Sequence, residues 1–310
     1  MVKASKFSDD LQKKADNLLH LSGHQFDWPD LPSRRVVIVG MGSSYFLGQW
    51  FSRRLQMVGI NAFALLASSR DIPVLADSDV VVAISATGQS AETAAFVDRV
   101  ERPVIFLTNN PEPPIHSQHH VVSLHSLPET GGVASLTYQA TIAALLDLEQ
   151  RLTGQIVPDS PFIKAAEATS WIIETQADWH KEILEQVTGG EGAQFVAPLE
   201  RLSSAQQSAL MMRECPRIRA EASEAGDWAH IDVYLTKNPD LRVVLFAGSP
   251  WQDQVLDWTT ERKRRVVLIG GHSDRVDVSL HYPHEDDELV ALLTETTFAE
   301  LVAAKLWSEQ

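Results

Sequence analysis

The sequence predicts an α/β protein made of two doubly wound parallel sheets, each with helices on both faces. Two observations carry this prediction. Short apolar runs alternate with helical patterns through the first half of the chain, and a similar order of elements recurs more faintly in the second half. The length of 310 residues also suits two domains of ordinary size.

The first half contains apolar runs of the length expected for buried parallel strands. Val36–Val39 is rich in β-branched residues and leads directly into Gly40, as a strand entering a tight turn would. A helix at residues 5–21 is expected before it, followed by a loop with Pro29 and Pro32. Further strands are expected at 62–66, 80–84, 104–107 and 121–124, and helices at 46–57, 91–100 and 134–152.

The second half repeats this rhythm with weaker signals. Apolar runs at 243–247 and 266–269 are followed by glycine, a shorter run lies at 194–197, and an edge strand is expected at His281–Pro283. Helices are expected at 160–186, 203–214 and 289–307. The predicted organisation is an N-terminal helix and linker at 1–33, a first domain at 34–155 and a second domain at 156–310.

Composition argues against several classes of function. The chain has 41 acidic and 26 basic residues, a net charge of −15, and no Lys/Arg-rich run, so no nucleic-acid partner is expected. No apolar window is long enough to span a bilayer, and the polar N-terminus lacks the apolar core of a signal peptide. Cys215 is the single cysteine, which fits a reducing, cytoplasmic location.

The segment Gly40-Met-Gly42-Ser43-Ser44-Tyr45 lies between an expected strand and an expected helix. Backbone amides at such a junction favour an anion, and the serine hydroxyls can donate to its oxygens. A dinucleotide fold would need glycine where Tyr45 stands and an acidic residue within Ala62–Ser69, and neither is present. A tight turn without a ligand is the alternative that this segment alone leaves open.

A second segment of the same kind is Ser85-Ala-Thr87-Gly88-Gln-Ser90. It carries three hydroxyls, whereas an ordinary helix cap needs only one. In a doubly wound sheet, both segments would lie at the carboxyl ends of strands, where ligands bind. The pair therefore predicts an oxyanion site.

These segments resemble the sugar isomerase (SIS) domain, which has a flavodoxin-like fold and occurs doubled in the isomerase half of glucosamine-6-phosphate synthase and in related phosphosugar isomerases and deglycases. Glu129-Thr-Gly-Gly-Val133-Ala-Ser135 resembles a third block of that family, with one inserted residue. The resemblance implies that these blocks hold a sugar phosphate. The implied binding residues are Gly42, Ser43, Ser44, Ser85, Thr87, Gly88, Ser90, Val133 and Ser135.

The resemblance also assigns two catalytic residues in the second half. Glu214 falls on the carboxylate that moves a proton between C1 and C2, and His230 falls on the histidine that assists ring opening. The chemistry is reasonable, because a buried carboxylate can act as a base near neutral pH and histidine titrates there. Taken without the family, a glutamate at a helix end such as Glu214 is usually a solvated residue, and a lone histidine such as His230 is more often structural.

Several positions depart from the family pattern. Met211 stands where the family has a lysine, and the chain ends inside its last helix, without the closing tail or the amidotransferase domain of the synthase. Ile231 and Asp232 replace the glycine and proline that follow the family's histidine. The second half's own loop, Pro198–Arg201, has lost its glycines and is expected not to bind phosphate.

The resulting expectation is a phosphosugar aldose–ketose isomerase that works through an enediol on a hexose or aminohexose phosphate. The alternatives are an amino-sugar-phosphate deglycase or deaminase, and a non-catalytic sugar-phosphate-binding module. No cofactor is expected. His116, His119 and His120 have the spacing of metal ligands, but they lie in a Pro-rich loop without nearby acids, so no metal site is expected. The resemblance implies a homodimer.

Overall fold

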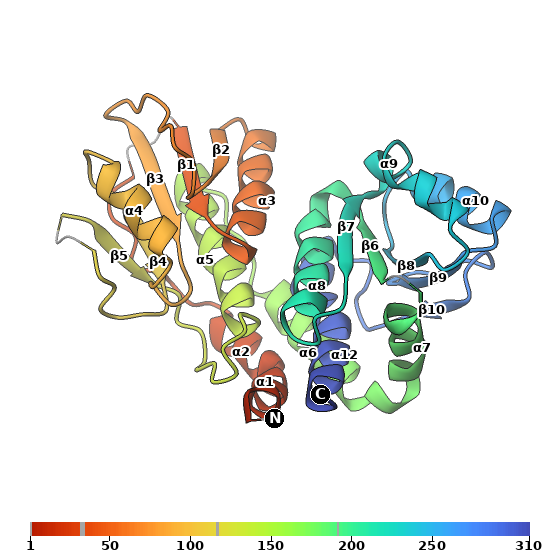
Figure 1. Ribbon diagram of the computed structural model, residues 1–310. Coiled ribbons are helices and arrows are strands. Elements are labelled where there is room, and N and C mark those ends of the chain that lie inside the picture. The colour runs from red at the N-terminus through yellow and green to blue at the C-terminus, as the bar shows by residue number, and fades with distance from the viewer. Residues whose placement is uncertain (1, 32–34, 116–117, 191) are drawn as a thin grey trace. The chain divides into compact units, whose positions relative to one another are not determined.

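The computed structural model describes residues 2–31, 35–115, 118–190 and 192–310, which form two compact units. His20–Pro128 and Leu136–Asp159 make up one of them, called here the first-sheet unit. Met1–Leu19, Glu129–Ser135 and Ser160–Gln310 make up the other, called the second-sheet unit. Each unit contains one five-stranded parallel sheet with helices around it (Figure 1).

The first sheet has the strand order β2-β1-β3-β4-β5. From β1 the chain runs outward to β2, and it then returns to the other side of β1 to form β3. The direction of winding therefore reverses between β1 and β3, which pair in parallel with Val39 opposite Ala83. The strands are β1 Arg35–Gly40, β2 Asn61–Leu66, β3 Asp79–Ile84, β4 Ile105–Thr108 and β5 His120–Ser123.

Both faces of the first sheet are covered. On one face, Val37 and Val39 pack in a core cluster with Phe96 of α4 (Ala91–Arg99). On the other, Ile38 contacts α3 (Ser43–Met57) at Gly48, where an added Cβ would lie 3.0 Å from the isoleucine methyl. The last helix of this unit is α5 (Leu136–Thr153), which packs beside α3. Because β1 is buried from both sides, its residues Val36–Val39 are apolar at every position.

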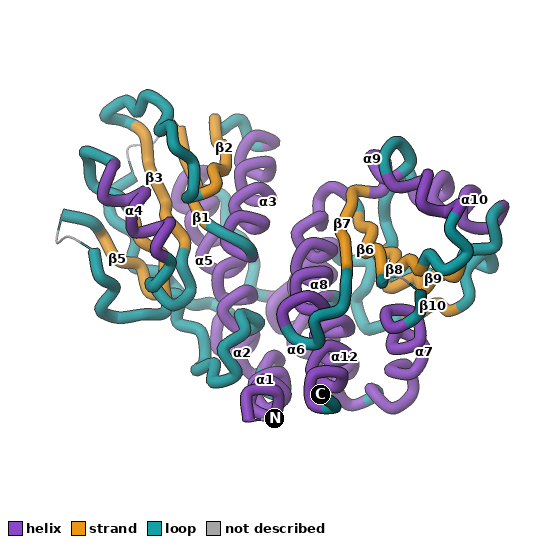
Figure 2. Tube along the Cα trace, viewed as in Figure 1, coloured by secondary structure: helices purple, strands orange, loops and turns teal. Residues whose placement is uncertain are grey.

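The second sheet has the order β10-β9-β8-β6-β7, which is the same winding pattern as the first. Here β6 takes the place of β1, and the winding reverses between β6 and β8. The strands are β6 Ala193–Ala197, β7 Ala220–Glu224, β8 Arg242–Phe246, β9 Arg265–Ile269 and β10 Val278–Leu280. Their path and the helices around them can be followed in the tube view (Figure 2).

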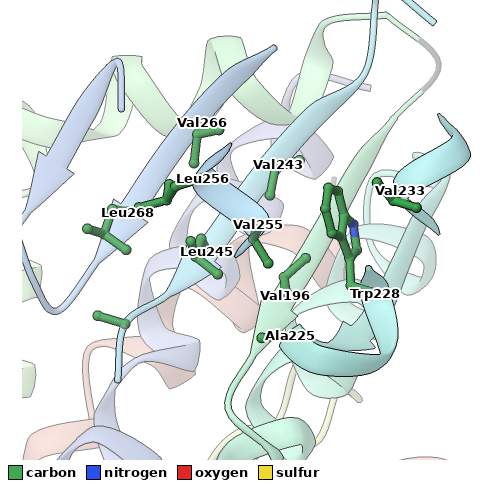
Figure 3. Packing of buried hydrophobic residues seen from close by; sticks show 11 residues of the cluster. Val196, Ala225, Trp228, Val233, Val243, Leu245, Val255, Leu256, Val266 and Leu268 are labelled. Atoms are coloured by element: carbon green, nitrogen blue, oxygen red, sulfur yellow. The ribbon is translucent and has the colours of Figure 1, made fainter. Parts of the chain in front are cut away.

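A cluster of aliphatic side chains fills one face of the second sheet, and the fully buried Trp228 lies at its edge (Figure 3). The indole N–H of Trp228 donates to the Gln194 amide oxygen at 2.9 Å, so the ring is held by packing and by a hydrogen bond. The helices on this face are α9 Ala225–Trp228, the 3₁₀ helix η2 Asp232–Lys237 and α10 Gln252–Glu261. The sheet also packs against α7 Gln176–Thr188 and, after the 3₁₀ turn η1 Leu199–Arg201, α8 Leu202–Glu214.

The second-sheet unit also contains the N-terminal residues of the chain. Helix α1 (Val2–Leu11) packs against the C-terminal helix α12 (Thr296–Ser308). Next to this contact, the ammonium of Lys14 is fully buried and pairs with the carboxylate of Glu300. The remaining helices are α2 Lys14–Leu21, α6 Ser160–Glu174 and α11 Glu288–Thr294.

The structure confirms the predicted fold class, and it corrects several elements. The helix expected at 5–21 is two helices, that at 160–186 breaks at Thr175, and that at 289–307 breaks at Glu295. The apolar stripe continues across each break, so periodicity alone does not reveal it. The edge strand is Val278–Leu280 rather than His281–Pro283, because the Tyr282 N–H is turned to the Glu285 carboxylate at 3.0 Å instead of to a neighbouring strand.

Strand β7 and helices α9 and α10 have no counterpart among the predicted elements. In β7 the sequence Ala-Glu-Ala-Ser-Glu has no large apolar side chain, because the strand lies at the sheet edge. None of the helices in the described ranges is both long enough and apolar enough to cross a bilayer.

Two histidines pack against each other in the first-sheet unit. The rings of His24 and His125 have centroids 4.1 Å apart, and His125 has a left-handed backbone with φ of 53°. Burial lowers the pKa of both rings from the usual 6.5, and each neighbouring imidazole lowers the pKa of His24 further, against the raising effect of Asp147. Folding therefore favours the neutral form of this pair.

A histidine held neutral by the fold stabilises the protein above its unfolded-state pKa. The free energy of unfolding should thus be highest above about pH 6.5 and decline as the pH falls from there towards the folded-state pKa values. His125→Asn keeps a residue that tolerates the left-handed backbone but removes one titrating ring. Urea unfolding between about pH 7 and pH 5 should therefore show a smaller loss of stability than in the wild type. His272→Asn, at an exposed position, is the control. If this variant showed the same reduction in the loss of stability with falling pH, the loss could not be assigned to the buried pair of histidines.

Candidate functional site

The turn after β1 depends on Gly42. This residue has φ 53° and ψ −128°, a region that only glycine occupies readily. It stands immediately before α3, and no side chain caps that helix. Ser43 begins the helix and Ser44 follows, half-buried and with no hydrogen bond from its hydroxyl to another described residue. The turn therefore presents an uncapped helix N-terminus and a serine hydroxyl.

The turn after β3 is closed by backbone hydrogen bonds. The N–H of Ser85 donates to the Leu107 carbonyl at 3.0 Å, and the N–H of Gly88 donates back to the Ser85 carbonyl at 3.0 Å. Ser85 and Gly88 are buried, whereas Thr87 is exposed and its hydroxyl accepts from the Gln89 N–H at 3.3 Å. The turn holds the Thr87 hydroxyl in a fixed loop open to solvent.

Ser90 differs from the other hydroxyls because it already has a structural role. Its oxygen accepts from the N–H of Thr93 at 3.2 Å and so caps α4, and it lies 3.1 Å from the carboxylate of Glu92. A ligand oxygen would have to compete with that carboxylate for the Ser90 proton. Ser90 therefore caps α4 in this structure, and its hydroxyl could donate to an anion only by giving up the hydrogen bond to Glu92.

The two turns begin next to each other at one edge of the first sheet. Adjacent strands lie roughly 5 Å apart, and the parallel register brings the ends of β1 and β3, Gly40 and Ile84, level with each other. The winding of the sheet reverses at this point, where open α/β sheets bind their ligands. The two turns that begin at this edge carry the predicted binding residues Gly42, Ser43, Ser44, Ser85, Thr87, Gly88 and Ser90.

The segment Glu129–Ser135 belongs to the second-sheet unit. Its ends are tied together, because the Glu129 carboxylate accepts from the Ser135 N–H at 2.6 Å and lies 3.3 Å from the Ser135 hydroxyl. The amide of Gln207 on α8 donates to the Ala134 carbonyl at 2.9 Å. Val133 and Ser135 are buried.

Asp10 holds the same segment from α1, a role that the sequence analysis did not assign. Its buried carboxylate accepts from the backbone N–H groups of Thr130 at 2.6 Å and Gly131 at 2.7 Å, and pairs with Lys13. Burial opposes ionisation, but Lys13 and the two amides outweigh it and lower the pKa of Asp10. A Cβ on Gly131 would lie 2.6 Å from the Cα of Phe7, so only glycine permits this contact. The signal in the sequence was a carboxylate within the apolar stripe of the first helix.

Glu214 is the last residue of α8. Its side chain reaches solvent, yet the surrounding protein is dense enough that burial raises its pKa. That direction suits a carboxylate that must accept and return a proton near neutral pH. The neighbouring Cys215 is buried, and burial together with the carboxylates of Glu214 and Glu300 raises the pKa of its thiol to about 12. The thiol is a packing group rather than a nucleophile.

His230 lies in the exposed turn between α9 and η2. Glu224 caps the N-terminus of α9, the helix before this turn, by accepting from the N–H groups of Gly226 and Asp227. Glu214 precedes β7 in the chain and His230 follows it. A parallel strand of this length, Ala220–Glu224, spans roughly 16 Å, so the structure places the two residues towards opposite ends of β7.

The histidine-rich loop shows structural roles where it is described. His116 lies outside the described residues. His119 is buried and its ring accepts from the Val104 N–H at 3.2 Å, while the His120 ring contacts the Asp27 carbonyl at 2.9 Å. Among the described residues, no three His, Cys, Asp or Glu side chains are grouped so that they could hold a metal ion.

Comparisons with known proteins show what the chain is similar to. Residues 31–148 match the SIS domain family. Over 297 residues the chain is 25% identical to the glutamine–fructose-6-phosphate aminotransferase (isomerizing) of Aquifex aeolicus, covering 88% of this chain and 49% of that protein. The chain thus spans between a third and a half of the length of the curated aminotransferases it matches.

Solved structures share the fold of this protein over nearly the whole chain. The tagatose-6-phosphate ketose/aldose isomerase of Escherichia coli superimposes with a TM-score of 0.70 at 17% identity, covering 99% of this chain and 90% of that one. The glucosamine-6-phosphate deaminase of Thermotoga maritima superimposes with a TM-score of 0.72 at 18% identity, covering 100% of this chain and 95% of that one. Residues 31–148 thus resemble a SIS domain, and the whole chain shares its fold with these solved structures.

The different environments of Thr87 and Ser90 lead to different expected effects of mutation. Thr87→Val removes an exposed hydroxyl that supports no helix, so it should weaken binding of inorganic phosphate by about tenfold and leave the melting temperature unchanged. Ser90→Ala removes a helix cap and should destabilise the protein by about 1 kcal/mol. Isothermal titration and thermal melts separate the two effects.

Ser78→Ala provides the control for the phosphate measurement. This serine precedes β3 at the opposite end of the sheet. Its substitution should change neither the phosphate affinity nor the melting temperature. Equal phosphate affinity in Thr87→Val and the wild type would remove the turn after β3 from the anion site.

Proposed function

We propose that the chain is a phosphosugar isomerase that interconverts an aldose and a ketose through an enediol, with a hexose or aminohexose phosphate as substrate. The observation that carries the proposal is the pair of hydroxyl-bearing turns at the winding reversal of the first sheet. The match of residues 31–148 to the SIS domain family and the named activities of the relatives support it.

In this proposal the turns after β1 and β3 hold the phosphate. The uncapped N-terminus of α3 supplies N–H groups and a favourable dipole end, and Ser44, Ser85 and Thr87 supply hydroxyl donors. No basic side chain is needed for this, because a dianion can be bound by several neutral donors that point to one place. The single phosphate fixes one end of an otherwise flexible sugar.

The proton transfer is assigned to Glu214. The carboxylate removes the proton from the carbon beside the carbonyl, which gives an enediolate, and the carboxylic acid so formed exchanges its proton with solvent or returns it to the neighbouring carbon. The hydroxyl proton passes from one oxygen to the other, so no proton is gained or lost overall. A carboxylate in water is too weak a base for this step. The raised pKa of Glu214 brings it closer to the strength required.

A deaminase or deglycase reaction is the second candidate. The Thermotoga maritima structure that matches this chain end to end carries the name glucosamine-6-phosphate deaminase. The same base and phosphate site could serve the release of an amine, because that reaction also begins by removing a proton beside a carbonyl or imine carbon. Products distinguish the two: a ketose phosphate alone for the isomerase, free amine for the other.

Glu214→Gln should abolish proton exchange at C2 of the substrate while leaving its affinity nearly unchanged. The amide keeps the shape of the side chain but cannot accept the proton, and loss of a general base typically lowers the rate by about 10²–10⁴. Incubation of a panel of hexose and aminohexose phosphates in D₂O, followed by NMR, measures the exchange. Titration of the same variant measures affinity.

Glu221→Gln is the matched control, since this glutamate lies on β7 of the same unit in an exposed pair with Arg219. It should behave as the wild type. If Glu214→Gln kept more than about half of the wild-type exchange, the carboxylate assignment would be wrong, since the expected loss is far larger. If the wild type bound a sugar phosphate but exchanged no proton and released no amine, the chain would be a binding module.

The placement of His230 leads us to propose that the active assembly is a homodimer. Within one chain Glu214 and His230 lie towards opposite ends of β7, too far apart to act on neighbouring atoms of one sugar. Exposed apolar side chains surround the His230 turn, with Ile231, Tyr234 and Trp251 each more than half exposed. The proposed occupant of this surface is a second copy of the chain, whose Glu214 would then act together with this His230.

Mixing two inactive variants tests this arrangement. Glu214→Gln and His230→Ala should each be nearly inactive on a cyclic substrate, but their mixed dimer contains one site with both wild-type residues. After exchange of subunits, about a quarter of wild-type activity should return, because half of the dimers are mixed and each has one of its two sites intact. A mixture no more active than its separate components would contradict the shared site. Light scattering that gives a monomer would contradict the dimer itself.

A further inference from the structure

The second sheet has its own winding reversal, between β6 and β8, and Arg201 lies there. Strand β6 ends at Ala197 as β1 ends at Gly40. Four residues beyond each strand end stand Arg201 in the second sheet and Ser44 in the first. By topology, Arg201 therefore takes the position of a hydroxyl proposed to bind phosphate.

The neighbouring turn shows the same correspondence. Directly after β8, the N–H of Ala247 donates to the Ile269 carbonyl at 2.9 Å, as the N–H of Ser85 donates to the Leu107 carbonyl directly after β3. Ala247 has no hydroxyl, so the second sheet lacks a counterpart of the Ser85 hydroxyl. Gly248 follows with φ of 103°, and a Cβ there would lie 3.0 Å from a terminal nitrogen of Arg201. The guanidinium thus fills the space over the turn.

The guanidinium of Arg201 is almost completely buried and donates to two acceptors. One terminal nitrogen donates to the Ala247 carbonyl, and the other to the carboxylate of Glu295. The Glu295 side chain, at the junction of α11 and α12, is fully buried. The Nε of Arg201 is buried too and has no hydrogen-bond partner in the described part of the chain. The guanidinium of Arg201 therefore pairs with the Glu295 carboxylate and has one N–H donor that no described residue uses.

A buried ion pair is a poor device for stability alone, because the desolvation of two charges offsets most of their attraction and apolar replacements often do as well. Guanidinium groups are, however, the side chains best suited to bind carboxylate and phosphate oxygens. We infer that the second sheet contains an anion site built around Arg201, and that the chain's own Glu295 carboxylate occupies it in place of a ligand. The wild-type second sheet is therefore closed to phosphate by an internal anion as well as by the loss of its glycine turn.

Removal of the Glu295 carboxylate should open the site to a small oxyanion. Glu295→Ala leaves the buried Arg201 without its counter-ion, so the variant should melt at a lower temperature than the wild type. Added formate should raise its melting temperature along a saturating curve, with a dissociation constant of about 1–50 mM as expected for a small ligand with few contacts. Chloride at matched ionic strength measures the general salt effect. Formate is the probe because phosphate could also bind the first-sheet turns.

The double variant Arg201→Met with Glu295→Ala is the matched control. It lacks both charges and should show only the linear salt effect that the wild type shows. A crystal of Glu295→Ala grown with formate should hold the ion within hydrogen-bond distance of Arg201. An ion elsewhere, a formate response equal in single and double variants, or no saturating response in the single variant would overturn the proposal.

Glu295→Ala could also fail to fold under ordinary conditions. In that case its refolding yield is measured with formate and with chloride at equal ionic strength, and the proposal requires a higher yield with formate that the double variant does not show. Equal yields would overturn it. Glu295→Gln fills the same space without charge, so it should fold and should not respond to formate; a saturating response there would also contradict the proposed site.

Discussion

The parallel pairing of β1 with β3 is the constraint on which the candidate site of the first-sheet unit depends. Parallel strands end at the same edge, and the winding reverses between these two, so no crossover helix separates their carboxyl ends. Two short turns from distant parts of the sequence thereby begin next to each other at one edge of the sheet. The proposal that their hydroxyls act together depends on the register that keeps Gly40 and Ile84 level.

The sequence was sufficient where a feature depends on a few consecutive residues. The buried strands were visible as apolar runs because both faces of each sheet are covered, and the turn at Gly42 was visible because its backbone conformation requires glycine. Strand β7 was not visible. An edge strand made of alanine, serine and glutamate has neither an apolar run nor a helical period, and only its pairing with β6 defines it.

The side-chain contacts of a residue, and its position relative to a strand, could not be predicted from the sequence. Ser90 has the sequence context of an anion ligand, but its contacts with Thr93 and Glu92 make it a helix cap in the structure. The spacing of Glu214 and His230 indicated a pair, yet β7 separates them, since spacing along a chain does not report which end of a strand a residue occupies. Asp10 gave a signal only as an acidic residue in an apolar stripe, and its partners lie some 120 positions further on.

The contact between helix α1 and Gly131 has a consequence for how relatives of this chain are compared. The shape of the Glu129–Ser135 segment is set jointly by Gly131, by the backbone at Phe7 and by the carboxylate of Asp10. A larger residue at 131 would be tolerated only if the first helix moved away, and a lost carboxylate at 10 would release two amides of the segment. These positions should therefore change together during evolution, and an alignment that begins at the first strand would leave out part of what shapes the segment.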